Sequence, residues 1–179
     1  MIYFKDSENN IYAYEENTPS NFLENKINEL GLISINKEDV DLIQKLNENE
    51  ELVRSRIIDI LYSVRNEYIY KNISYNNFEF IADSQAQNKI ANMIFFALQV
   101  GKTDTDPVAD WDCVNGEYQD ITLADLKNIA QLMVTQEQTA RAILRVLKSK
   151  YNQASKELLI NSDVEQDFEN MWNAQTSLG

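Results

Sequence analysis

Two short aromatic stretches, each leading into a long run with helical spacing, constrain the fold of this chain most strongly. Residues 73–80 read Ile-Ser-Tyr-Asn-Asn-Phe-Glu-Phe, and residues 111–122 carry Asn115-Gly116 between two alternating segments. Alternation on both sides of an Asn-containing turn predicts a β-hairpin. Apolar residues then recur every three or four positions over residues 84–100 and 123–151, which predicts a helix after each hairpin. This arrangement leaves little room for a catalytic pocket and indicates a protein that presents surfaces.

The rest of the chain predicts one more hairpin and several helices. Residues 1–14 alternate around the polar cluster 6–10, which indicates strand, turn and strand. Thr18-Pro19 is typical of a helix start, Gly31 of a helix end, and Asn36 of an N-cap. Expected helices cover residues 19–30, 37–46 and 51–70, and Ser162 is expected to cap a last short helix through Trp172. The helix over residues 84–100 is expected to be covered on most sides, because its apolar residues spread widely around it.

These elements predict a predominantly helical α+β fold, a helical bundle with two or three small antiparallel hairpins. The polar connector at residues 47–50 is the best candidate boundary. We therefore expect an N-terminal hairpin with short helices over residues 1–49, a helical domain with two hairpins over residues 50–152, and a helical C-terminal tail over residues 153–179. The first of these parts is a candidate partner-binding module.

Composition excludes several classes of function. The chain has 16 basic and 29 acidic residues, a formal charge of -13, so nucleic-acid binding through phosphate contacts is not expected. It has no histidine and a single cysteine, Cys113, which removes the usual catalytic pairs and metal-binding spacings. No apolar run approaches the ~18 residues of a membrane span, and the first residues do not read as a secretory signal. We expect no enzyme activity, no cofactor, no metal, and no membrane partner.

Carboxylate pairs are the remaining candidates for chemistry, and they are expected to be solvated surface charge. The pairs are Asp104 with Asp106 and Asp110 with Asp112, and Asp163, Glu165 and Asp167 form a third group. Acid–base work needs burial or mutual repulsion to separate the pKa values of two carboxyls, and loops and polar helix faces supply neither. Asp112 beside Cys113 is expected to raise the thiol pKa, which disfavours a nucleophile.

Aromatic side chains on the hairpins are the candidate binding residues. Aromatic residues concentrate affinity at protein interfaces at little entropic cost. The candidate protein-binding set is Tyr3, Tyr12, Tyr14, Tyr75, Phe78, Phe80, Trp111 and Tyr118. Around the first central hairpin, a local core is the other interpretation that stays open. The same choice applies to the apolar seam from Leu126 to Tyr151, which either packs within the chain or joins copies into a homo-oligomer.

Several short motifs follow one another in a fixed order along the central section. They are Arg54-Ser55-Arg56 and Arg65-Asn66-Glu67-Tyr68-Ile69, the hairpin from Ile73 to Phe80, Ala82-Asp83-Ser84-Gln85-Ala86-Gln87, Trp111 with Asn115-Gly116-Glu117-Tyr118, and Ile121-Thr122-Leu123-Ala124-Asp125-Leu126. With these motifs, residues 51–151 resemble an uncharacterised domain of bacteriophage and prophage tail proteins, often described as tail-fibre assembly proteins. Asn77 stands where that pattern has glycine. The opening from Tyr3 to Tyr14 also resembles the start of many tail-fibre assembly proteins.

The resemblance implies a non-enzymatic, chaperone-like tail-fibre assembly protein that acts by protein–protein binding. Its partner would be a phage tail fibre or another tail protein, and its place the cytoplasm of the bacterial host or the virion tail. Two alternatives stay open: a structural component of the tail or virion, and an acidic inhibitor that mimics nucleic acid. The resemblance carries over no catalytic, cofactor-binding or metal-binding residue.

Overall fold

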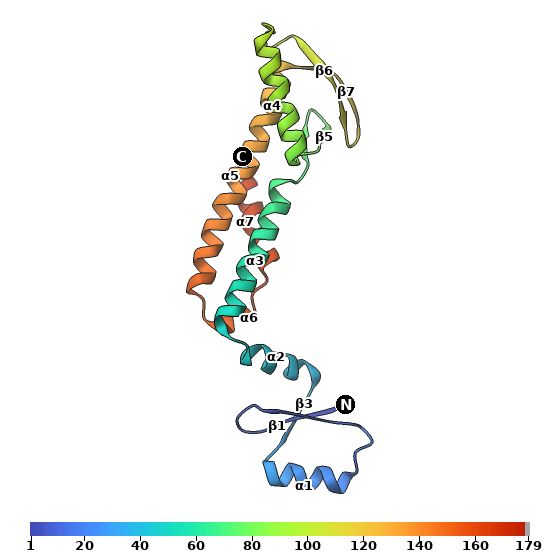
Figure 1. Cartoon of the computed structure of the whole chain (residues 1–179), viewed down its shortest axis with the longest axis vertical. Coiled ribbons are helices and arrows are strands. Elements are labelled where there is room, and N and C mark those ends of the chain that lie inside the picture. The colour runs from blue at the N-terminus through green and yellow to red at the C-terminus, as the bar shows by residue number, and fades with distance from the viewer. Residues whose placement is uncertain (178–179) are drawn as a thin grey trace. The chain divides into compact units, whose positions relative to one another are not determined.

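A computed structural model describes residues 1–177, and it shows the predominantly helical α+β fold that the sequence predicts. The strands are short and antiparallel. In chain order (Figure 1) the elements are β1 (Ile2–Lys5), β2 (Ile11–Tyr14), α1 (Ser20–Leu30), β3 (Ile33–Ile35), α2 (Lys37–Asn47), α3 (Glu50–Ile69), β4 (Ile73–Tyr75), β5 (Phe78–Phe80), α4 (Ser84–Gln99), β6 (Pro107–Cys113), β7 (Gly116–Thr122), α5 (Leu123–Gln153), α6 (Lys156–Ile160) and α7 (Val164–Thr176). No helix within residues 1–177 has the length and apolar character that crossing a membrane requires.

The chain divides into two compact units. The N-terminal unit comprises residues 1–55 and 155–162, and the C-terminal unit comprises residues 56–154 and the chain from Asp163 on. The sequence predicts a boundary after residue 49 and a separate tail from residue 153, whereas the structure divides that tail between the units. In the N-terminal unit α6 packs on α2, and Lys156 donates a hydrogen bond to the Leu46 carbonyl oxygen. In the C-terminal unit α7 packs on α5.

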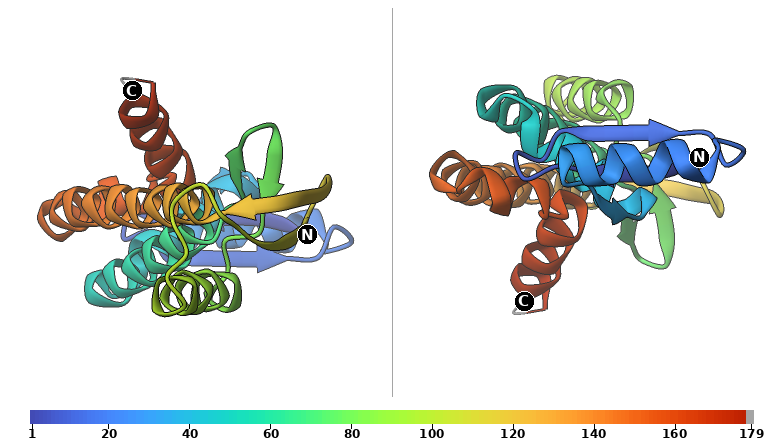
Figure 2. Two further views of the ribbon diagram at one scale, coloured as in Figure 1. Left: turned by 90° about the horizontal axis from the view of Figure 1, so that it is seen from above. Right: turned by 90° about the horizontal axis from the view of Figure 1, so that it is seen from below.

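The N-terminal unit is built around a three-stranded sheet of order β2-β1-β3. The predicted hairpin is β1 and β2, with Phe4 opposite Tyr12, and β3 adds to the other edge of β1. Helix α1 lies across one face of this sheet (Figure 2), where the ring of Tyr14 contacts those of Phe4 and Phe22. Gly31 ends α1 in the left-handed conformation, with a φ of 61° that glycine adopts without strain.

Local capping signals set most helix starts. Asn36 caps α2 and exchanges two hydrogen bonds with Asp39, and Thr122 forms the same reciprocal box with Asp125 at α5. Two predicted caps are wrong by one residue. Pro19 occupies the N-cap position of α1 without a side-chain cap, and Asp163, rather than Ser162, accepts the capping bond of α7. Asp163 caps α7 because its carboxylate accepts a hydrogen bond from the backbone N–H of Gln166, and its negative charge interacts favourably with the positive end of the helix dipole.

The C-terminal unit is a helical bundle with α5 at its centre. The seam on α5 is covered within the chain, since Leu126, Met133 and Leu144 are all buried. Ring contacts of 4.9 Å and 4.8 Å between centroids join Tyr68 of α3 to Phe168 and Trp172 of α7. The apolar seam therefore belongs to the core of one copy.

Two hairpins pack against the bundle at the α4 end of the C-terminal unit. Asn76 and Asn77 form the turn between β4 and β5 with φ angles of 50° and 66°, so the Asn-Asn pair works as a left-handed turn. The second hairpin is longer than the predicted residues 111–122, because β6 already begins at Pro107. Register shifts near Ala109 hide the alternation of this strand from the sequence.

Candidate functional site

The hairpin aromatics of the C-terminal unit mainly build its core. Phe80 is 0% exposed and Trp111 is 5% exposed, and both belong to a buried cluster with Ile121 and Ile129. The prediction that these two side chains lie on a binding surface is therefore wrong. Their rings approach each other at 6.3 Å between centroids, so the hairpins use their aromatics to dock on each other and on α5.

Tyr75, Phe78 and Tyr118 are half-buried and tie the hairpins to the start of α5. The Tyr75 hydroxyl donates to Asp125 Oδ1 at 2.9 Å, and the Phe78 ring meets the edge of Tyr118 at 4.9 Å between centroids. Burial acts to raise the pKa of Asp125, but hydrogen bonds from Thr122 and Tyr75 outweigh it, and the net effect lowers that pKa. These three aromatics therefore have structural contacts that already account for their positions.

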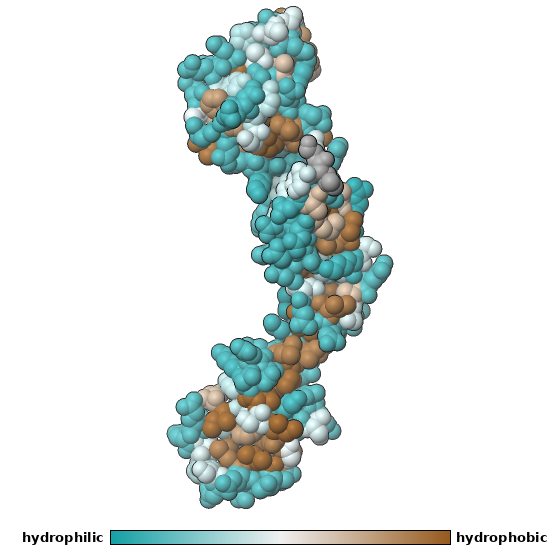
Figure 3. All heavy atoms as spheres, turned by 180° about the vertical axis from the view of Figure 1, so that it is seen from behind, coloured by the Kyte–Doolittle hydropathy of each residue, from teal (hydrophilic) through white to brown (hydrophobic). Residues whose placement is uncertain are grey.

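The tyrosines of the N-terminal unit lie on two faces of its sheet. Tyr12 and Tyr14 share the face that carries Phe4, and the Tyr12 hydroxyl donates to Asp6 Oδ2 at 3.1 Å. Tyr3 lies on the opposite face with Ile33, which is 60% exposed, and Ile35. The space-filling view shows apolar side chains gathered on this unit (Figure 3). Among the three candidate binding tyrosines of this unit, Tyr3 is therefore the one that lies on the face with exposed apolar neighbours.

The carboxylate pairs are engaged in local structure rather than with each other. Asp104 forms an ion pair with Lys127, and Asp106 accepts hydrogen bonds from the backbone and hydroxyl of Thr103. Asp110 accepts the backbone N–H of Asp120 at 2.8 Å. Within residues 1–177, no three His, Cys, Asp or Glu side chains are grouped so that they would hold a metal ion.

Helix α4 carries the surface that sequence reasoning missed. Phe95 and Phe96 are 62% and 64% exposed, and Leu98 and Val100 are also exposed. The expectation that this helix is covered on most sides is wrong, because α5 and the hairpins cover a single face, centred on Ile90 and Ala97. The signal was present in the sequence: residues 84–103 contain no acidic residue in a chain that has 29.

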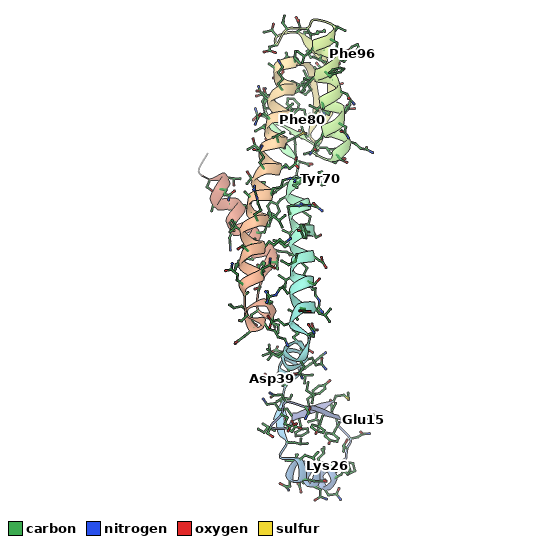
Figure 4. All side chains as sticks on the ribbon, turned by 60° about the vertical axis from the view of Figure 1, so that its left-hand side comes forward. Glu15, Lys26, Asp39, Tyr70, Phe80 and Phe96 are labelled. Atoms are coloured by element: carbon green, nitrogen blue, oxygen red, sulfur yellow. The ribbon has the colours of Figure 1, made fainter. Side chains whose placement is uncertain are left out.

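A shallow, open groove of about 640 Å³ runs along one side of this helix and is our candidate binding site. Met93 and Val108 of the groove pack against the buried cluster, while Phe96 projects from the outer side of α4 (Figure 4). We call it the α4–β6 groove, and its lining residues are Gln85, Asn88, Lys89, Asn92, Met93, Phe96 and Val108. Its floor is apolar and is supplied by two different elements of the C-terminal unit.

The polar lining of the α4–β6 groove is almost entirely uncharged. Among the described residues, the side-chain amides of Gln85, Asn88 and Asn92 have no hydrogen-bond partner. Lys89 Nζ stands 4.2 Å from the centre of the Trp111 ring, so a cation–π contact holds this charge at the side of the groove. Each amide supplies both a donor and an acceptor, which are the groups that pair with a peptide backbone.

Such a groove is suited to an extended polypeptide segment. Amides every three or four residues along α4 offer bonds to main-chain N–H and C=O groups, and the apolar floor offers contact area to side chains. The depletion of charge and the exposed phenylalanine are the compositional marks of the centre of a protein interface. The groove therefore supports binding rather than bond-making chemistry.

One family model matches the chain, and it covers residues 53–170. That family is described as "Domain of unknown function (DUF4376)". The match includes the hairpins, α4 and the whole of α5, so the α4–β6 groove lies inside it. No curated protein and no solved structure matches the chain.

Proposed function

Since the chain belongs to the DUF4376 family of domains of unknown function, we propose that it is a non-enzymatic phage or prophage tail-fibre assembly protein. It binds its partner in the α4–β6 groove, which lies inside the family region. In this role it binds an extended, apolar segment of a tail fibre and keeps that segment from aggregating before the fibre assembles. The single observation that carries the proposal is the α4–β6 groove, with its apolar floor and three unpaired amides.

The identity of the partner is supported by resemblance rather than by geometry. The order of motifs from residue 51 to 151, and the opening from Tyr3 to Tyr14, resemble tail-fibre assembly proteins. A chaperone of this kind works in the cytoplasm of the bacterial host, where fibres are made. A structural part of the tail would instead be found in the finished particle.

Co-expression with the tail-fibre protein of the phage or prophage that encodes this chain tests the proposal. The wild-type chain is expected to raise the yield of soluble fibre and to co-purify with it. Phe96→Ser removes the exposed ring at the groove and is expected to reduce both, because an aromatic anchor at the centre of an interface contributes about 2 kcal/mol or more.

Val146→Ser is the matched control for this experiment. Val146 is an exposed apolar residue on α5, 53% exposed, and it does not line the groove. The control is expected to behave as the wild type. If the wild-type chain changes no fibre yield and forms no complex, or if Phe96→Ser performs as well as Val146→Ser, the assembly role is wrong. Mass spectrometry of purified particles separates an assembly factor, expected to be absent, from a tail component, which must be present.

A further inference from the structure

The side of α4 that faces away from the α4–β6 groove carries a second apolar surface. Ala91, Phe95 and Leu98 follow one another at spacings of four and three, so they share one side of the helix. Beside them, α5 contributes Ala130 and Val134, of which Val134 is 45% exposed. We call these five residues the α4–α5 surface. Phe96 is excluded from it, because one residue along a helix turns the side chain by about 100°.

A small groove lies within reach of this surface. It has a volume of about 150 Å³, it runs between α4 and α5, and it is lined by Gln87, Ile90, Ala91, Ala130, Met133, Val134 and Glu137. Ala91, Ala130 and Val134 belong to both the groove and the surface, and Phe95 stands one helical turn beyond Ala91 along the same side of α4. One face of the molecule thus offers an exposed ring and, one turn away, a groove lined by small and apolar residues.

We infer that the α4–α5 surface joins two copies of this chain about a two-fold axis. A two-fold interface is made by the same patch on both copies, so the patch must fit itself. If two α4 helices run antiparallel and cross at the level of Met93, Phe95 of each copy lies opposite Ala91 of the other. Each ring then enters the small groove of the opposite copy, and both grooves are filled by one operation.

Charge favours this surface over the rest of the chain for a contact between two copies. Each copy carries a formal charge of -13, so contact between most other parts of the surface brings acidic groups together. Residues 84–103 contain no acid, and the one acid at the small groove, Glu137, is paired with Arg141 on the next turn of α5. The apolar seam of α5 is already buried within one copy, so it is not the surface that joins two.

Measurement of the mass in solution tests the inference directly. Light scattering or sedimentation of the wild type at about 50 μM is expected to give twice the 20.8 kDa chain mass. Phe95→Ser is expected to give the single-chain mass. Phe96→Ser, which changes a neighbouring ring of nearly equal exposure on the other side of the helix, is expected to keep the double mass. Circular dichroism checks that all three proteins keep the same helix content.

A second variant tests the other side of the same contact. Ala91→Glu places a charged side chain in the small groove, where Phe95 of the other copy would lie, so it is expected to be a single chain. Circular dichroism again checks that the helix content is kept. The inference is overturned if the wild type is a single chain at ~100 μM, if Phe95→Ser and Phe96→Ser shift the mass alike, or if Ala91→Glu keeps the double mass.

Discussion

A buried tyrosine shows how single residues hold the C-terminal unit together. Tyr151 is 0% exposed, and its hydroxyl donates to Asp167 Oδ2 at 2.6 Å, while Lys150 forms an ion pair with the same carboxylate. Burial acts to raise the pKa of Asp167, yet the hydrogen bonds from Lys150 and Tyr151 prevail, and the net effect lowers that pKa from 3.8. The contact joins the end of α5 to α7.

Asp167→Ala is expected to lower the free energy of unfolding by about 1–3 kcal/mol, because it removes an acceptor of a buried hydroxyl. Because the folded pKa of Asp167 is depressed, the stability it contributes is present above the unfolded pKa and is lost as the pH falls through the folded pKa. Urea titrations at several pH values should therefore show the difference between wild type and Asp167→Asn shrinking below about pH 4. Glu169→Gln, which neutralises an exposed carboxylate on the same helix, is the control. If the stability difference between wild type and Asp167→Asn stays unchanged at low pH, the lowered pKa of Asp167 is contradicted.

The single cysteine makes a second prediction at this scale. Burial raises the pKa of the Cys113 thiol, and Asp112 acts in the same direction. Alkylation by iodoacetamide is expected to be slow at pH 7.5 and to accelerate only above the ordinary thiol pKa of about 8.5. The urea-unfolded chain should react with the ordinary pH profile. Reaction of the folded protein at pH 7 as fast as that of free cysteine would show an activated thiol instead.

At the scale of elements, the reciprocal box at the start of α5 fixes where the second hairpin ends and the long helix begins. Thr122 donates to and accepts from Asp125, and Tyr75 adds a bond from the first hairpin. Thr122→Ala is expected to cost about 1 kcal/mol of stability, and Asp125→Ala more, since it also frees the Tyr75 hydroxyl from its carboxylate. Thr122→Ser keeps a capping hydroxyl and should unfold at nearly the wild-type urea concentration. Equal urea midpoints for all three variants would show that the Thr122–Asp125 box does not stabilise the fold.

The sequence predicts best the elements that are set by interactions between residues close together in the chain. Asn36, Asp83 and Thr122 start helices through bonds to backbone groups three residues on, so their positions are readable from the chain. β3 escaped prediction because a three-residue strand exists only through its pairing with β1, about 30 residues earlier.

The candidate sites were harder to predict than the elements. Aromatic residues on a hairpin are equally suited to a core and to an interface, and only the packing of the hairpins on α5 assigns Phe80 and Trp111 to the core. The apolar residues of α4 surround most of the helix, so the sequence alone does not say which of them the fold covers. The absence of acid over residues 84–103 is the one local sign of the α4 surfaces.

At the scale of the whole molecule, charge is the dominant property. A formal charge of -13 on 179 residues opposes compact states through self-repulsion, and salt screens it. Raising NaCl from about 10 mM to about 500 mM at pH 7 is expected to raise the Tm by about 2–4 °C, equivalent to about 1 kcal/mol. Calorimetry measures the change in Tm. A parallel measurement in sodium sulfate at equal ionic strength shows how much of that change depends on which salt is used. A Tm that falls with NaCl would mean that attractive ion pairs outweigh the repulsion.

The path of the chain through its two units limits how the protein can be divided. The backbone leaves the N-terminal unit after residue 55, returns to it as α6, and leaves again after residue 162. A protease that cuts once at residue 55 therefore releases nothing as a separate piece as long as α6 stays packed on α2. A chain shortened to the family region, residues 53–170, retains α6 and Leu159 but loses α2. A chain of that region alone lacks the helix on which α6 packs, so grafting experiments should carry residues 155–162 along with the first 55.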